Sequence, residues 1–297
     1  MQCGRNIVPR GKNASGAGGE AANGVPRRGL FGLAAAPPAS YPELRSPGLR
    51  LTFADEFDRF DWNEASSTSV RQRPPTGLWS TRYWWNEGDR TAPANKERQF
   101  YSDASVGTHP FRIEDGALVM TARPSIDPAT TQGLPYTSGM ITTEGTFSQR
   151  YGRFEMRARL PRGRGLWPAF WLLPQDHSWP PEIDIMEVLG HEPARFFGSA
   201  HSMASGERTA TIHDAEVDDL SDGFHAFALD WRPDRLRWRV DGRPVFGMPT
   251  ADDMHRPMYL LANLAVGGAW PGEPDAATPF PAEMAIDHIR VWQFGDL

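Results

Sequence analysis

The sequence predicts an all-β protein in which two antiparallel sheets stack around one core. After residue 48 it consists of short, strand-like segments separated by turn residues, with no internal repeat and no long amphipathic helix. This pattern is typical of a sandwich or a barrel. The 297 residues suffice for one large all-β domain, which we place at residues 49–297, and a tail at residues 1–48.

Alternation identifies the clearest strands. Residues 153–160 and 235–240 carry apolar side chains at even positions and charged side chains at odd positions. A strand with this pattern has one face in the core and one face in water. Trp238 is therefore predicted to be a core residue. Further strands are expected at residues 50–53, 111–114, 117–122, 138–143, 168–173, 182–188, 195–201, 223–231, 243–246, 257–265 and 284–293.

Turn residues separate these strands. Asp115-Gly116 and Asp241-Gly242 each lie between two strand candidates. Tight hairpins need positive φ, which Asp and Gly tolerate, so both pairs predict hairpin turns. Segments 62–78 and 86–96 carry Pro, Gly and charged residues and are expected to be surface loops, where ligand contacts are often built.

Charge and hydrophobicity limit the kinds of partner that the protein could bind. Lys and Arg total 31 against 37 Asp and Glu, a net charge of −6 that argues against nucleic acid. The longest apolar run, residues 166–174, is too short for a transmembrane helix, so no membrane span is expected. The single cysteine, Cys3, allows no disulfide within the chain. The 11 Trp can fill a core or stack on sugars, and a monomer is the default expectation.

The tail at residues 1–48 is expected to be disordered. Arg27-Arg28, an apolar stretch at 30–36 and the small residues and prolines after it resemble a twin-arginine export signal. This predicts a secreted or periplasmic protein. The alternative is a tail with a chance apolar patch.

Three acids on one predicted strand are the candidates for chemistry: Glu182, Asp184 and Glu187. Strict alternation would send Glu187 into the core, where an unpaired carboxylate is costly. A β-bulge at Ile185–Met186 would return Glu187 to the face of the other two acids. The two glutamates could then converge to about 5 Å, the separation of a retaining glycosidase, in which one carboxylate attacks and the other protonates the leaving oxygen.

The spacing does not say which glutamate attacks. Asp184, between them, would orient the nucleophile by sharing a proton or a hydrogen bond. A solvated strand edge or a calcium site is the alternative use of three acids, although like charges crowded on one face repel each other.

Several blocks resemble glycoside hydrolase family 16 in the same order along residues 50–293. Glu-Ile-Asp-Ile-Met-Glu at 182–187 resembles the bulged form of the family's catalytic motif. The other blocks are Phe53-Ala54-Asp55-Glu56-Phe57, Asn95–Tyr101, Ser138–Thr143, Tyr151–Glu155, Gly165–Trp171, Asn263–Gly268 and Ile286–Val291.

The resemblance implies a β-jelly-roll sandwich with a substrate cleft across its concave sheet, and retaining hydrolysis of internal β-linkages in a polysaccharide without a cofactor. By motif position, Glu182 would be the nucleophile, Asp184 its assistant and Glu187 the acid/base. Residues 138–201 look most like bacterial enzymes that process succinoglycan-type exopolysaccharides at β-1,3/β-1,4 linkages. Laminarinase-type endo-β-1,3-glucanases share the motif, but many carry Trp where this chain has Ser202.

Substrate-binding residues are expected from the same blocks. The tryptophans could stack on sugars or fill the core, and the histidine could bind a hydroxyl or be an ordinary buried polar residue. The candidates are Asn95, Glu97, Trp167, Trp171, His201, Asn263 and Trp270.

Two further expectations come from the family. Many members hold a structural calcium on the convex side, and Glu56 and Asp287 resemble its contacts. Ordinary surface pairing is the alternative for these two acids. The rival functions are a lectin-like glycan-binding jelly roll, which has no need of both Glu182 and Glu187, and a transglycosylase.

Overall fold

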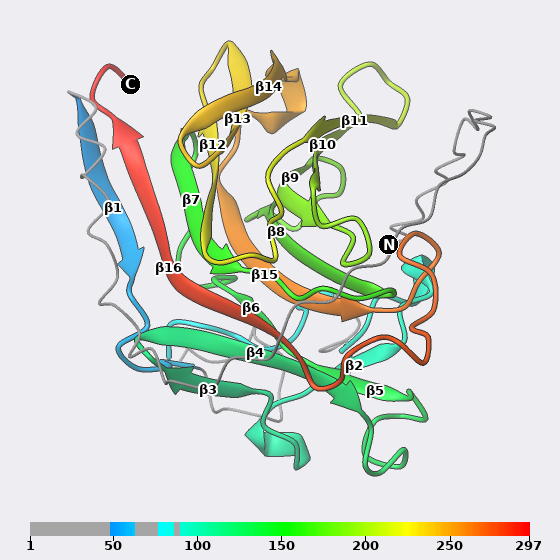
Figure 1. The fold of residues 1–297 in the computed structure, drawn as a ribbon. Helices are drawn as coiled ribbons and strands as arrows, with labels where there is room; N and C mark the ends of the chain where they lie inside the picture. Colours follow the sequence, from blue (N-terminus) through cyan, green and yellow to red (C-terminus); the bar gives the residue numbers. More distant parts are fainter. Residues whose placement is uncertain (1–47, 63–76, 86–89) are drawn as a thin grey trace, which may run out of the picture.

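Two β-sheets packed face to face form the protein (Figure 1). The structure, a computed structural model, describes residues 48–62, 77–85 and 90–297. The predicted tail and its export motif lie outside the described residues, except for Gly48. Among the described residues, no helix has the length and hydropathy needed to cross a bilayer.

The larger sheet has the strand order β14-β13-β12-β7-β16-β4-β5-β2, with β1 added to β16 and β3 added to β4. All described neighbours in it pair antiparallel except β2 and β5, which are parallel. Its strands are β1 (Leu49–Asp55), β2 (Gln99–Tyr101), β3 (Phe111–Glu114), β4 (Ala117–Pro124), β5 (Tyr136–Ser138), β7 (Gly152–Arg159), β12 (His225–Trp231), β13 (Arg235–Val240), β14 (Arg243–Pro249) and β16 (Ala282–Phe294).

The smaller sheet has the order β11-β10-β9-β8-β15-β6. Its strands are β6 (Met140–Thr142), β8 (Leu166–Pro174), β9 (Glu182–Val188), β10 (Arg195–Ser202), β11 (Thr209–Glu216) and β15 (Met258–Val266). Three short 3₁₀ helices complete the described elements: η3 (Pro93–Asn95), η4 (Ala104–Val106) and η5 (Asp252–Met254). The predicted all-β class is confirmed.

The core lies between the two sheets and uses the predicted alternation. The even-numbered residues of β7 and β13 are buried in one cluster, which includes Phe154 and Trp238. The hairpin predictions are also confirmed, because Asp115 and Asp241 have φ of 51° and 48° and each is followed by a glycine with positive φ.

Three elements differ from the sequence prediction. The segment 138–143 is interrupted at Gly139, and its halves join different sheets as β5 and β6. A side chain at position 139 would collide with Met120, since a Cβ there would lie 2.5 Å from it. The three-residue strand β2 was not among the predicted strands. β11 escaped prediction because it is an edge strand in which no described residue is buried, so it needs no apolar face.

The predicted bulge in β9 is present. Glu187 pairs with Ala169 of β8, Met186 with Phe170, and then Asp184 with Trp171, so Ile185 is the extra residue. Ile185 and Met186 are both fully buried in the core. The bulge thus turns two consecutive apolar residues inward and returns Glu187 to the outer face.

The opposite sheet supports this bulge. Trp238 of β13 crosses the core and its Nε1 donates a hydrogen bond to the backbone oxygen of Asp184 at 2.8 Å. Gly198 of β10 makes room for the ring, because a Cβ there would lie 2.5 Å from Trp238 Nε1. The indole therefore holds the bulged strand at the residue between the two glutamates.

Replacing Gly198 by alanine should destabilise the fold, because the new methyl group collides with Trp238. Overpacking of this kind costs about 1–3 kcal/mol in the free energy of unfolding. Urea denaturation measures the loss, with Ser205→Ala in the exposed β10–β11 loop as the control. An unchanged unfolding midpoint for Gly198→Ala would refute the support assigned to Trp238.

A buried ion-pair group stabilises the outer face of the larger sheet. Asp230 of β12 accepts hydrogen bonds from Arg153 Nε at 2.6 Å and Arg239 Nε at 2.8 Å. Burial alone would raise the pKa of Asp230, but the hydrogen bonds and charges of the two arginines outweigh it and hold the pKa below its usual value.

We expect Asp230→Asn to lower the free energy of unfolding at pH 7 by about 3–5 kcal/mol, since it leaves buried arginine charge uncompensated. The folded-state pKa is lowered, so the contribution of Asp230 is present above the unfolded pKa of about 3.9 and is lost as pH falls through the folded value. Denaturation at several pH values should therefore show the difference between wild type and variant shrinking below about pH 4. Asp296→Asn, at the exposed pair with Arg232, is the control and should change little.

Candidate active site

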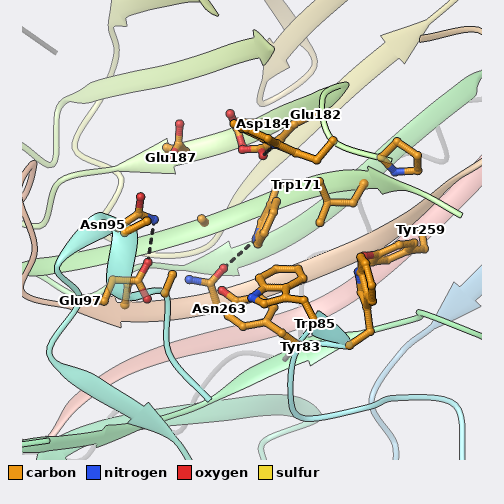
Figure 2. Close-up of a pocket in the computed structure, with 18 of the residues that line it drawn as sticks. Tyr83, Trp85, Asn95, Glu97, Trp171, Glu182, Asp184, Glu187, Tyr259 and Asn263 are labelled. Atoms are coloured by element: carbon orange, nitrogen blue, oxygen red, sulfur yellow. Dashed lines mark hydrogen bonds between the residues drawn. The ribbon is translucent and has the colours of Figure 1, made fainter. Parts of the chain in front are cut away.

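A cleft of about 390 Å³ lies on the face of the smaller sheet that is turned away from the core (Figure 2). Strands β8, β9 and β15 form its floor, and segments 83–85 and 92–97 form one wall. The three predicted catalytic acids lie in a row on β9, facing aromatic side chains across the cleft. The cleft expected from the sequence is therefore present.

Each of the three acids accepts a hydrogen bond. Trp179 Nε1 donates to Glu182 Oε2 at 2.7 Å, and Trp167 Nε1 donates to Glu187 Oε1 at 3.1 Å. The hydroxyl of Ser199 on β10 donates to Asp184 Oδ2.

The three carboxylates are each only 1% exposed, so the wet strand face expected from the sequence is instead a closely packed floor. Burial of a charge is tolerated when hydrogen-bond donors compensate for the lost water, which is the role of these three contacts.

His201 lies beside two of the acids. Its Nε2 is 3.3 Å from Asp184 Oδ2 and 3.8 Å from Glu182 Oε1. His201 is buried on the neighbouring strand β10, where it pairs with Glu182, and it is not among the residues that line the cleft. Nitrogen and oxygen atoms of Glu182, Asp184 and His201 lie within 4.8 Å of one another, close enough to approach a metal ion.

A chain of hydrogen bonds runs under the cleft from the floor to the wall. Trp171 Nε1 donates to Asn263 Oδ1 at 2.8 Å, and Asn263 Nδ2 donates to the Tyr101 hydroxyl at 3.0 Å. Glu97 in turn accepts from the Tyr101 hydroxyl at 3.4 Å. It also accepts from Asn95 Nδ2 at 3.0 Å (Figure 2). Burial, reinforced by the charge of Glu97, raises the pKa of Tyr101 well above its usual value, so its hydroxyl stays a donor.

Comparison with known proteins settles the family. A family model described as Glycosyl hydrolases family 16 matches residues 96–290. The chain belongs to glycoside hydrolase family 16. It is 34% identical over 274 residues to a Beta-glucanase of Rhodothermus marinus, a match that covers 84% of this chain and 87% of that protein.

One further relative and one solved structure are also similar to the chain. Over 251 residues the chain is 38% identical to Endo-1,3-1,4-beta-glycanase EglC of Rhizobium meliloti (strain 1021), which covers 82% of this chain and 52% of that protein. The chain thus spans about half the length of that relative. The X-ray structure of the laminarinase from Rhodothermus marinus superposes with a TM-score of 0.68 at 32% identity, covering 84% of this chain and 99% of that one. The β-jelly-roll class implied by the sequence is thereby confirmed.

Most residues expected from the family-16 resemblance meet at the cleft. Five of the seven substrate-binding candidates line it together with the three acids: Asn95, Glu97, Trp167, Trp171 and Asn263. Trp270 lies one layer back, with its ring edge-on to Trp167 at 5.3 Å between ring centroids. Their roles toward a substrate stay predictions.

Several cleft residues were missed from the sequence. Tyr83 and Trp85 stack with ring centroids 4.0 Å apart, and Trp84 stacks on His177 at 3.9 Å. Together with Trp179 and Tyr259 they give the cleft an aromatic wall. The run Tyr83-Trp84-Trp85 just before a polar loop was the one available signal.

The two acids expected to bind calcium lie on the outer face of the larger sheet and face cations. Arg290 donates to both oxygens of Glu56 at 2.7 Å, which holds the pKa of Glu56 below its usual value. Asp287 lies 2.7 Å from His288 Nδ1 and 3.1 Å from Arg157 Nη1. Both carboxylates are thus already paired with cationic side chains, which a calcium ion would have to displace. Calcium binding at these residues stays a prediction.

Glu97→Gln tests the hydrogen-bond chain under the cleft. Asparagine, glutamine and tyrosine donors converge on this carboxylate, and an amide would present its own N–H groups to them. The free energy of unfolding should fall by about 1–3 kcal/mol, measured by urea denaturation. Glu207→Gln, at an exposed glutamate, is the matched control. Equal stability of the two variants would contradict the network.

Proposed function

We propose that the chain is a retaining endo-β-glycanase that hydrolyses internal β-1,3 or β-1,4 linkages of a glucan or a bacterial exopolysaccharide. The observation that carries the proposal is the pair Glu182 and Glu187, which the bulge brings to one cleft from a single strand. Each glutamate is held by a donor that cannot accept a proton, since an indole nitrogen only donates.

The reaction proceeds in two displacements. The Glu182 carboxylate attacks the anomeric carbon, the bond to the glycosidic oxygen breaks, and Glu187 gives its proton to that oxygen. Water then attacks the anomeric carbon, Glu187 takes the proton of the water, and Glu182 leaves as a carboxylate. Two inversions give net retention.

The contacts of Glu187 and Asp184 support these roles. Trp167 holds Oε1 of Glu187 with a hydrogen bond, and the proposal assigns the proton transfer to Oε2. Asp184 is fixed by the Ser199 hydroxyl and lies 3.3 Å from His201, so it forms a rigid partner between the two glutamates.

The substrate is proposed to be a β-1,3-1,4-linked polymer of the exopolysaccharide type. The name of EglC supports this assignment, and so does Ser202, at a position where many laminarinases are expected to carry Trp. Ser202 donates to Asp253 at 2.7 Å, which holds the small side chain in place. The laminarinase alternative is supported by the structural similarity to the enzyme of Rhodothermus marinus.

Export to the periplasm or the medium is proposed as well. Arg27-Arg28 and the apolar stretch after them support it, and so does a polymeric substrate that lies outside the cell. A monomer is the expected state.

Glu182→Gln and Glu187→Gln should each lower kcat on the natural polymer by at least about 1,000-fold, because each removes one of the two groups that act on the bond. New reducing ends are measured on succinoglycan, mixed-linkage β-glucan, laminarin and agarose. Cleavage of the first two is expected.

The outcomes separate the candidates. Cleavage of laminarin alone would move the enzyme to the laminarinase side, and tight binding of a polymer without cleavage would favour the lectin-like alternative. Full activity of Glu182→Gln would overturn the mechanism. Asp296→Asn, which lies outside the cleft, is the control: it is purified and assayed in the same way and should keep the activity of the wild type.

A further inference from the structure

Trp179 contacts the proposed nucleophile, Glu182, from outside the catalytic strand. It lies in the β8–β9 connection, lines the cleft, and donates its indole hydrogen to Glu182 Oε2 at 2.7 Å. We propose that Trp179 is a positioning residue that presents one oxygen of the nucleophile to the sugar and stabilises the carboxylate as it leaves the glycosyl-enzyme. This inference rests on the proposed function, because it takes Glu182 as the nucleophile.

The backbone around Trp179 is fixed on both sides. Before it, Asp176 accepts from the amide and hydroxyl of Ser178, and Arg256 Nη1 donates to Asp176 Oδ2 at 2.9 Å and to the Ser178 hydroxyl at 3.0 Å. After it, two prolines lead directly into Glu182, and proline restricts φ. The loop therefore holds the indole at one place relative to β9.

The ring itself is held from the β10–β11 loop. The guanidinium of Arg208 lies 5.4 Å from the centre of the Trp179 ring, within cation–π range. Asp253 anchors the same loop, accepting from the amide of Met203 at 2.6 Å. The exposed guanidinium of Arg208 thus contacts the face of the indole, while the indole Nε1 points at Glu182.

The geometry divides the two oxygens of Glu182. Oε2 accepts the indole hydrogen, and Oε1 lies on the other side, 3.8 Å from His201 Nε2. The proposal assigns the bond to the anomeric carbon to Oε1, since Oε2 is directed by the indole. In the intermediate Oε2 becomes the carbonyl oxygen of the ester and keeps its donor.

The donor affects the two chemical steps unequally. In the second step water attacks, the bond from Oε1 to the anomeric carbon breaks, and the electron pair returns to the carboxylate. Negative charge grows on Oε2, so the hydrogen bond strengthens in that transition state. In the first step the carboxylate loses negative charge. The hydrogen bond then has two opposite effects on the rate: it orients the attacking oxygen, which speeds the step, and it stabilises the charge of the free carboxylate, which slows it. Loss of the donor should therefore slow the second step more than the first.

The test uses Trp179→Phe and a dinitrophenyl β-oligoglucoside, whose leaving group needs no protonation. We expect kcat to fall about 10- to 100-fold, the loss of one hydrogen bond to a charged group, and KM to fall with it. The ratio kcat/KM, set by the first step, should stay within about 3-fold. A burst of dinitrophenol and a glycosyl adduct in the intact mass should accompany the change.

Trp167→Phe is the matched control, since it removes the equivalent donor from Glu187. In Trp167→Phe the slow step should be the removal of a proton from the attacking water by Glu187. Azide can attack in place of water and has no proton to lose, so azide should restore turnover of Trp167→Phe. It should not restore turnover of Trp179→Phe. Trp179→His restores a ring N–H and should recover part of kcat. Trp179 is partly exposed, and the unfolding temperature of each Trp179 variant should stay within about 2 °C of wild type.

Other outcomes overturn the inference. Unchanged kcat, a rise in KM at constant kcat, or rescue of Trp179→Phe by azide would each show that Trp179 does not act on Glu182. These results leave the proposed function standing if the wild type cleaves the substrate and Glu182→Gln does not. A wild type without activity would instead remove the proposed function and the inference together.

Discussion

The bulge at Ile185 is the constraint on which the site depends. Without it, period-two alternation would place Glu187 in the core and Met186 in the cleft. With it, Ile183, Ile185 and Met186 all pack in the core, and the three acids share the cleft face. The indole of Trp238, admitted by Gly198, fixes the backbone of Asp184 from the opposite sheet. The same bulge therefore packs the apolar residues of β9 in the core and brings its acids together in the cleft.

Burial of the acids creates a second requirement, which tryptophan meets. Three carboxylates that are almost inaccessible to water need donors, and donors that also accepted protons would compete with the chemistry. Trp167 and Trp179 supply N–H groups to the two glutamates and close the cleft with apolar surface. Trp171 does the same for Asn263 on the floor. The high tryptophan content is thus explained by contacts with named polar groups as well as by stacking.

Features that depend on local pattern could be predicted from the sequence. These are the fold class, both Asp-Gly hairpins and the bulge, the last because an unpaired glutamate in a core is costly. β11 could not be predicted, since an edge strand without a buried face shows no apolar alternation. The aromatic wall could not be predicted either, nor could the hydrogen bonds that Trp179 donates to Glu182 and Ser199 donates to Asp184. These contacts depend on which segments become neighbours in the fold. Glu56 shows the same limit, since its partner Arg290 is distant in sequence.

The central claim is that Glu182, which shares the cleft face with Glu187 because of the bulge, forms the covalent bond to the sugar. The most direct measurement is labelling with an activated 2-deoxy-2-fluoro-β-oligoglucoside, followed by proteolysis and mass spectrometry of the peptide that contains β9. The account predicts one stable adduct, located on Glu182. An adduct on Glu187, or an active enzyme that forms no adduct, would contradict it.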